Sequence, residues 1–565
     1  MKKISFIAAL GLSLLAASVQ AQTKTPALAG VEVKISLQQD GKLDLSYTLP
    51  PGCEVLPLRG GPWSFKQQRE WRKDWLPADD CGTQSDAGIT RHRASCPAVR
   101  FTLTPRAYSQ EQPMSPASLV DGQGVMLHTG SIAPTEACGP VQWHFASAKG
   151  SVMLDGFVRG SAMRMAESAM PGLRFTSLYL SLQPLDAGAA LATIVGAGVP
   201  PWLRSSISEA AEGIMLHYHQ TLPQAEVGSA ALIVTQGSDT GAMRFTLDGG
   251  RSRMLRLNYL NPTEQIDARQ SQSVRSSIAH EVAHILQPGL QSPALVYPER
   301  TLMIEGGAEF LRWMSEYRLG WKSSAQLADE LDEALNLCLM EVGDLPWKRF
   351  LKRNVGRTPN QCGLAIHVMV LAARQSPLSA ETVLGNLYAA LRKNPATDIA
   401  RALECGEVAA CSVQVLPDLL GGNVGFGVQM RELMTNLAII KKSDLQPNAQ
   451  ASRLFSRAAF SQLMTEDCSS LAYWVRDSYF EIGRSETCKT FEAGMKISKA
   501  EGVSLFDEPR QAAQAIAGAC DKNGAVNLRT LEDRAVRVEC RNPYRPSKNF
   551  YKLDTGKILT LLDAR

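Results

Sequence analysis

Three features are scarce or absent in this chain of 565 residues, and each narrows the class of protein. No Cys-x-x-Cys pair occurs, which argues against a cysteine-ligated metal cluster. Beyond residue 17, no uninterrupted apolar run approaches the roughly 18 residues that would span a membrane. Lys and Arg exceed Asp and Glu by only four, so the charge gives no reason to expect a nucleic acid or an acidic membrane as a partner.

The first 21 residues have the pattern of a secretory signal peptide. Two lysines precede an apolar run at residues 4–17, and small residues follow at Ser18 and Ala21. We therefore expect residues 1–21 to be removed and the mature protein to be periplasmic or secreted. Position 22 is Gln, so the cysteine that a bacterial lipid anchor requires is absent there.

The twelve cysteines predict disulfides, because an even number in an exported chain is typical of an oxidising compartment. They fall into four local groups, and we expect pairing within each group, with the connectivity left open. The groups are Cys53, Cys81, Cys96 and Cys138; Cys338 and Cys362; Cys405 and Cys411; and Cys468, Cys488, Cys520 and Cys540.

Hydrophobic periodicity predicts an α+β multidomain protein. Apolar and polar residues alternate through much of residues 22–180, which predicts a β-rich N-terminal domain, with residues 63–90 as a long loop dense in charge, Pro and Gly. Residues 181–445 begin with strand signals and continue with helical spacing. Residues 446–565 show short β-like runs around one helical stretch, 510–517, and predict a small αβ domain.

A candidate catalytic motif occurs at His280-Glu281-Val-Ala-His284. On a helix, two histidines four residues apart share a face, with their Cβ atoms about 6 Å apart, and both can reach one zinc ion. Glu281 is then placed to take a proton from a water at the open coordination position, as a general base. The alternative is a chance match in a buried helix.

A second predicted helix carries Glu305-Gly306-Gly307-Ala308-Glu309, whose acidic residues are again four apart. Glu305 suits the third ligand, because catalytic zinc sites use two histidines and one glutamate. Glu309 could accept the free N–H of a ligating histidine. The reverse assignment stays open, as does an ordinary solvated helix face. The three small residues between the acids would let this helix approach another closely.

The motif His-Glu-x-x-His, followed after twenty intervening residues by Glu-Gly-x-Ala-Glu, resembles the gluzincin metallopeptidases of the MA-like type, which include the aminopeptidase N and glycyl aminopeptidase families. The resemblance is specific over about residues 200–380. It implies a thermolysin-like catalytic domain with one Zn²⁺ ion. In such a domain the edge strand of a small sheet aligns a peptide or protein substrate at the metal. Residues 446–565 also resemble a degenerate PDZ domain, a peptide-binding module, although a merely structural domain is equally compatible.

Two departures from that family pattern limit what it implies. Arg244 stands where aminopeptidase N relatives have a glutamate that binds the substrate amine, which leaves aminopeptidase and endopeptidase activity both open. The helix over residues 361–371 has no tyrosine for the oxyanion. His367 on that helix is a candidate for this role, against the alternative of a core histidine.

A second hypothesis, from a different class, is a non-catalytic secreted protein that binds peptides on a gluzincin scaffold. Retention of both histidines and both glutamates of the motifs speaks against it, because a binding scaffold has no chemical need for Glu281. The oligomeric state is not predicted by the sequence.

Overall fold

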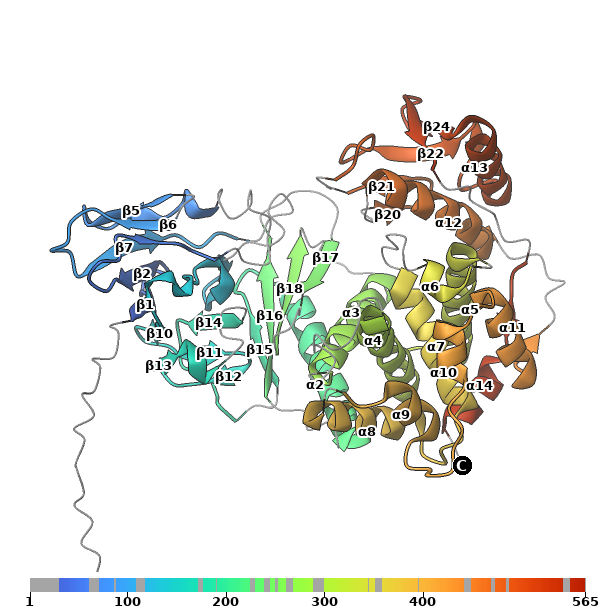
Figure 1. The fold of residues 1–565 in the computed structure, drawn as a ribbon, viewed down its shortest axis with the longest axis horizontal. Helices are drawn as coiled ribbons and strands as arrows, with labels where there is room; N and C mark the ends of the chain where they lie inside the picture. The colour runs from blue at the N-terminus through green and yellow to red at the C-terminus, as the bar shows by residue number, and fades with distance from the viewer. Residues whose placement is uncertain are drawn as a thin grey trace, which may run out of the picture.

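The computed structural model shows a multidomain α+β protein (Figure 1). The signal-peptide prediction at residues 1–21 lies outside the described residues. The residues that the structure describes are 30–59, 71–85, 88–107, 117–170, 176–188, 191–223, 229–237, 244–248, 253–260, 268–287, 299–343, 345–350, 358–394, 396–441, 449–468, 473–483, 487–541 and 549–563.

Two antiparallel-rich sheets form the N-terminal part, in strand orders β13-β10-β1-β2-β7-β4 and β12-β11-β14-β9-β8. In β1, inward and outward residues alternate as the sequence pattern requires, and large side chains such as Trp143 and Phe145 fill the space between the sheets. The strands are β1 (Val31–Leu37), β2 (Leu43–Thr48), β4 (Leu76–Pro77), β7 (Ala98–Leu103), β8 (Ala117–Val120), β9 (Gly124–His128), β10 (Val141–Ser147), β11 (Val152–Leu154), β12 (Phe157–Val158), β13 (Ala162–Ala166) and β14 (Ser177–Ser181).

The prediction of a long loop at residues 63–90 is wrong for the residues of this segment that the structure describes. It contains the hairpin strands β5 (Gly82–Ser85) and β6 (Gly88–Arg91), and β6 also pairs with β3 (Val55–Leu56). Gly82 is needed in this hairpin because a Cβ there would lie 2.3 Å from the Thr90 carbonyl oxygen. The charged residues, Pro and Gly that indicated a loop therefore belong in part to short, closely packed strands.

A further sheet of four strands, in the order β15-β16-β18-β17, separates the N-terminal strands from the helices (Figure 1). One face of this sheet, including Ile233, packs on the N-terminal sheets, and the other, including Leu232, packs on helices. Burial on both faces explains the nearly continuous apolar run in β16. The strands are β15 (Leu191–Val195), β16 (Ala230–Gln236), β17 (Arg244–Asp248) and β18 (Met254–Leu260).

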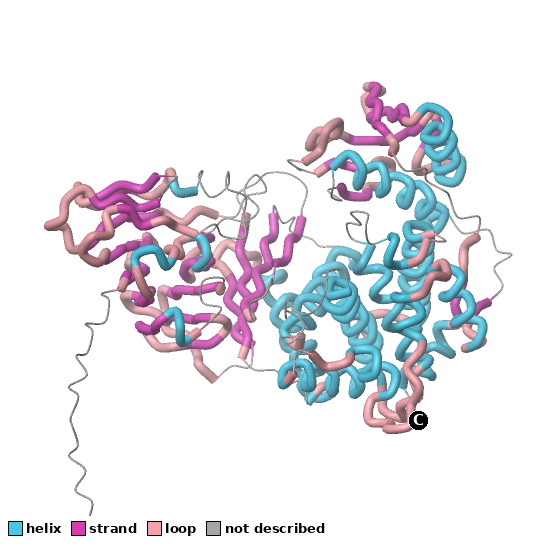
Figure 2. The backbone as a smooth tube through the Cα atoms, viewed as in Figure 1, coloured by secondary structure: helices cyan, strands magenta, loops and turns pink. Residues whose placement is uncertain are grey.

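Helices make up the central part, shown in cyan in Figure 2, and share one hydrophobic core. The sequence predicted mostly helical structure here, and the structure confirms it. The helices are α2 (Pro201–Thr221), α3 (Ala268–Ile285), α4 (Glu299–Arg318), α5 (Ser324–Val342), α6 (Trp347–Phe350), α7 (Thr358–Ala373), α8 (Ala380–Lys393), α9 (Ile399–Cys405), α10 (Val415–Gly421) and α11 (Phe426–Asn436).

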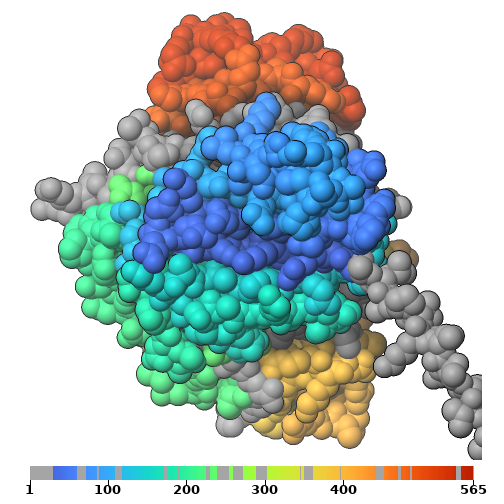
Figure 3. Space-filling view, turned by 90° about the vertical axis from the view of Figure 1, so that its left-hand side faces the viewer, coloured from blue at the N-terminus to red at the C-terminus, as the bar shows by residue number. Residues whose placement is uncertain are grey.

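The C-terminal part contains more helix than the single stretch that the sequence predicted. A sheet in the order β20-β21-β22-β24-β25 has a core of its own with α12 and α13, whereas the last elements, β26 and α14, pack on the central helices. The elements are β19 (Ile440–Lys441), α12 (Ala449–Cys468), β20 (Tyr473–Val475), β21 (Phe480–Ile482), β22 (Lys496–Ala500), β23 (Val503–Ser504), α13 (Pro509–Asn523), β24 (Ala525–Thr530), β25 (Ala535–Glu539), β26 (Lys552–Leu553) and α14 (Thr555–Asp563). Figure 3 shows C-terminal residues above the N-terminal strands. Similarity to a PDZ domain stays a prediction.

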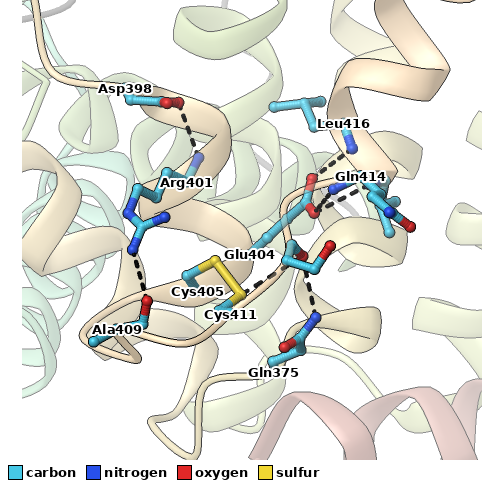
Figure 4. The surroundings of a disulfide bond; sticks show 11 residues. Gln375, Asp398, Arg401, Glu404, Cys405, Ala409, Cys411, Gln414 and Leu416 are labelled. Atoms are coloured by element: carbon cyan, nitrogen blue, oxygen red, sulfur yellow. Dashed lines mark hydrogen bonds between the residues drawn. A yellow bond between two sulfur atoms is a disulfide. The ribbon is translucent and has the colours of Figure 1, made fainter.

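Six disulfides join all twelve cysteines, each within a group expected from the sequence, and they fit a protein of an oxidising compartment. Figure 4 shows the bond between Cys405 and Cys411, beside which Glu404 accepts hydrogen bonds from three backbone N–H groups at the start of α10. Within the described part of the chain, no helix is both long and apolar enough for a transmembrane segment.

Candidate metal centre

Helix α3 presents both motif histidines on one side. Its buried side chains, among them Ile278 and Val282, pack into the central core, while His280 and His284 stay partly exposed. The two Nε2 atoms lie 3.2 Å apart and the ring centroids 4.8 Å apart. The helical spacing therefore aims both imidazoles at one point.

Helix α4 adds Glu305 to this point. Its Oε2 atom lies 3.4 Å from His280 Nε2 and 3.7 Å from His284 Nε2. The carboxylate of Glu281 is also near, since one of its oxygens lies within 4.8 Å of ligand nitrogens of both histidines. The structure thus brings together four of the residues singled out from the sequence: His280, Glu281, His284 and Glu305.

Glu309 lies behind His280, with its Oε1 atom 3.4 Å from Nδ1 of that ring. Arg312 holds Glu309 from the other side through a 2.7 Å hydrogen bond and also binds Glu316, a fully buried carboxylate, at 2.6 Å. Burial raises the pKa of Glu309, but the charges of Arg312 and His280 and the hydrogen bond from Arg312 together outweigh burial and leave the pKa below its usual value. Glu309 is therefore an anion, suited to accept a hydrogen bond from an Nδ1–H group of His280.

The two histidines differ in their affinity for protons. Burial lowers the pKa of His280, but the surrounding carboxylates, first among them Glu305, outweigh burial and raise it above its ordinary value. The pKa of His284 is lowered, by burial and then by the neighbouring His280. Negative charge is thus concentrated around two converging imidazoles, an environment that favours a bound cation.

Two neighbours of the predicted ligands were missed by sequence reasoning. Gln287 Oε1 lies 3.0 Å from Nδ1 of His284, and Asn360 on α7 donates a 3.3 Å hydrogen bond to Oε2 of Glu305. Gln287 lies just beyond the end of α3, and no motif includes it. Asn360 follows Glu305 by 55 residues, so only the packing of α7 on α4 reveals its place.

His367 is placed in the interior of the helical core. It is 1% exposed, its Nδ1 atom lies 2.8 Å from the Gly363 carbonyl oxygen, and its ring stacks on Phe310. These contacts agree with the alternative of a core histidine. Burial lowers the pKa of His367 to about 4.

The donor atoms that the structure brings together fit a zinc ion. Two ligands at about 2.0 to 2.1 Å from one zinc are about 3.3 Å apart when the geometry is tetrahedral. The separations of 3.2, 3.4 and 3.7 Å among the two Nε2 atoms and Glu305 Oε2 are close to that value. A set of two nitrogens and one oxygen is also the donor set that zinc takes in hydrolytic sites.

No family model matches the chain, and no curated protein matches it by sequence. The arrangement of the described elements nevertheless defines a distant aminopeptidase-like fold. It is similar to the crystal structure of an aminopeptidase N family protein from Idiomarina loihiensis, with a TM-score of 0.53 and 13% sequence identity, over 94% of this chain and 100% of that one. At this identity the similarity concerns the fold, so the roles of the site residues stay predictions.

Proposed function

We propose that this protein is an exported zinc metallopeptidase that hydrolyses peptide bonds. The observation that carries the proposal is the convergence of three donor atoms, from His280, His284 and Glu305, beside the carboxylate of Glu281. The aminopeptidase-like fold and the six disulfides support a peptidase scaffold and a periplasmic or secreted location, respectively.

In this proposal His280, His284 and Glu305 would hold one zinc ion. When bound, zinc would polarise the substrate carbonyl and lower the pKa of a water molecule towards neutrality. Glu281 would take a proton from the attacking water molecule and then give that proton to the departing amine. Glu309 keeps the ring of His280 oriented, because Arg312 fixes its carboxylate.

The substrate would be a peptide or protein strand lying along β17. This strand is at the end of the sheet, pairs with β18 and packs against α3, which carries the motif. An extended peptide can add to such an edge through backbone hydrogen bonds. Arg244 is the first residue of β17, and residues 241–243 before it lie outside the described residues. Digestion of N-acetylated peptides distinguishes the two activities. An endopeptidase cuts them, whereas an aminopeptidase requires a free N-terminal amine.

The test is digestion of a mixed peptide library by the mature protein beside its Glu281→Gln variant, with bound zinc quantified in both. We expect the wild type to cut and the variant to bind zinc with turnover lowered by at least a hundredfold, because the general base is lost. Equal turnover in the two proteins would refute the role of Glu281.

A second candidate function is peptide binding without catalysis. Two observations favour it. Helix α7 contains no tyrosine, and His367 on this helix is buried, so α7 supplies neither of the two groups expected to stabilise the oxyanion. Zinc binding and peptide binding without cleavage by the mature wild type would support this alternative.

A further inference from the structure

We infer that Gln287 is a positioning residue that fixes the ring and the tautomer of His284. The inference rests on the proposed function, since it concerns one of its metal ligands. Gln287 follows the last turn of α3 and is 2% exposed. Its side-chain oxygen Oε1 lies 3.0 Å from His284 Nδ1, on the side of the ring opposite the converging Nε2 atoms.

The orientation of the Gln287 amide follows from its other contacts. Its Nε2 atom donates to the carbonyl oxygen of Ile304, at 3.0 Å, and to the hydroxyl of Tyr388, at 3.2 Å. A flipped amide would set its oxygen against the Ile304 carbonyl oxygen, which has no proton to share. Oε1 must therefore face His284, and it can only accept. His284 consequently carries its proton on Nδ1 and leaves the lone pair of Nε2 for a metal.

The sequence around Glu305 makes room for this amide. A Cβ atom at Gly307 would lie 2.9 Å from the Tyr388 hydroxyl and 3.0 Å from Gln287 Nε2. Tyr388 comes from α8 and is 1% exposed, so the whole arrangement lies in the core. The lack of a side chain at Gly307 therefore leaves space for the hydrogen bonds of Gln287, whereas the lack of one at Gly306 lets α4 approach α7 closely.

The two histidines are thus held by different chemistry. His280 lies beside the anionic Glu309, which Arg312 fixes, and His284 lies beside a neutral amide fixed by a carbonyl and a phenol. A neutral amide orients the ring without adding a further charge to a buried site that already holds several carboxylates.

The experiment measures zinc affinity by chelator competition, independently of turnover. In Gln287→Met, which keeps the length but removes the hydrogen bonds, we expect zinc binding to weaken 10- to 100-fold. Gln287→Glu restores an acceptor for His284 Nδ1 but loses the N–H donor to the Ile304 carbonyl oxygen, so we expect its zinc affinity to lie between those of Gln287→Met and the wild type. The thermal midpoint of each metal-free protein is measured alongside.

Gln272→Met is the matched control. Gln272 lies on the same helix and donates to Glu316 of α4, at 3.3 Å, but does not contact His284 in any described interaction. We expect its zinc affinity to equal that of the wild type. If Gln287→Met binds zinc as tightly as the wild type, the inference is overturned while the proposed function stands. If Gln287→Met and Gln287→Glu weaken zinc equally, in step with their loss of stability, the role is structural and the inference is also overturned. A wild type that binds no zinc overturns both the inference and the proposed function.

Discussion

Gly306 of α4 and Gly363 of α7 touch backbone to backbone: a Cβ added to Gly306 would lie 2.4 Å from the Gly363 Cα atom. This contact confirms the close helix approach that the small residues after Glu305 predicted. It also brings the first turn of α7 to the site, where Asn360 reaches Glu305. The packing of the two helices and the geometry of the site therefore depend on the same pair of residues.

Gly306→Ala should lower the free energy of unfolding by about 1 to 3 kcal/mol, because backbone cannot move aside as a flexible side chain can. Denaturant unfolding measures the change. The control is Gly518→Ala in α13, where an added Cβ meets no atom within 4 Å. That variant should be neutral or stabilised by up to about 1 kcal/mol through its helix propensity. A Gly306→Ala protein as stable as the control would contradict the tight contact.

Arg312→Met should destabilise the protein by about 3 to 5 kcal/mol, since it removes the buried cation that three carboxylates share and leaves only Lys322 beside two of them. Arg312 is 6% exposed and binds Glu309, Glu316 and Glu330. The matched control is Arg534→Met, which breaks a fully exposed ion pair with Glu492 and should leave the unfolding midpoint unchanged within error. Similar losses in both variants would show that burial does not set the strength of the network.

His367 should make the protein less stable in acid. The pKa of His367 is about 4 in the folded protein, against an ordinary value of 6.5. Between these two pH values, the unfolded chain therefore binds a proton that the folded chain does not. Stability from this residue is complete above pH 6.5 and falls as the pH drops to about 4, by up to about 3 kcal/mol. His367→Phe should flatten the dependence of unfolding free energy on pH over that window.

The same variant tests the catalytic role considered for His367. A core histidine predicts that His367→Phe keeps its zinc and at least a third of the wild-type turnover. Loss of turnover by a hundredfold or more, with zinc and stability retained, would instead support the role at the oxyanion.

The disulfides should differ in their contribution to stability according to the loops they close. Cys405 and Cys411 are separated by 6 positions, and Cys53 and Cys138 by 85. By chain entropy, replacing the shorter bond with two alanines should cost about 2.5 kcal/mol and the longer about 4.5 kcal/mol. Denaturant unfolding of the two double variants checks the order. A larger loss of stability on removing the shorter bond would show that this disulfide also holds Glu404 and its loop in place, in addition to its effect on chain entropy.

The sequence predicted the parts of the site that follow from helical periodicity. His280 with His284, and Glu305 with Glu309, are each four apart, so a single helix already sets which side chains share a face. Gln287 and Asn360 could not be found in this way, because what places them beside the ligands is packing between helices. Tyr388, the anchor of Gln287, is 101 residues further along the chain.

The elements that the sequence analysis missed fall into two kinds. The hairpin of β5 and β6 is specified by packing around Gly82 rather than by alternation, so local composition pointed to a loop. In α12, by contrast, buried residues such as Leu454, Ala458 and Phe455 recur at helical spacing, and the pattern was present in the sequence.

The return of β26 and α14 to the central helices bears on the order in which the protein can fold. Asn336 accepts a hydrogen bond from the backbone of Tyr551, and Asp332 accepts one from Leu553, more than 200 residues later in the chain. A ribosome or a translocation pore delivers those partners long after α5 has emerged. The helical core that carries the candidate site therefore reaches its final packing only after residues 551–563 have been released, which would delay maturation of the site until then.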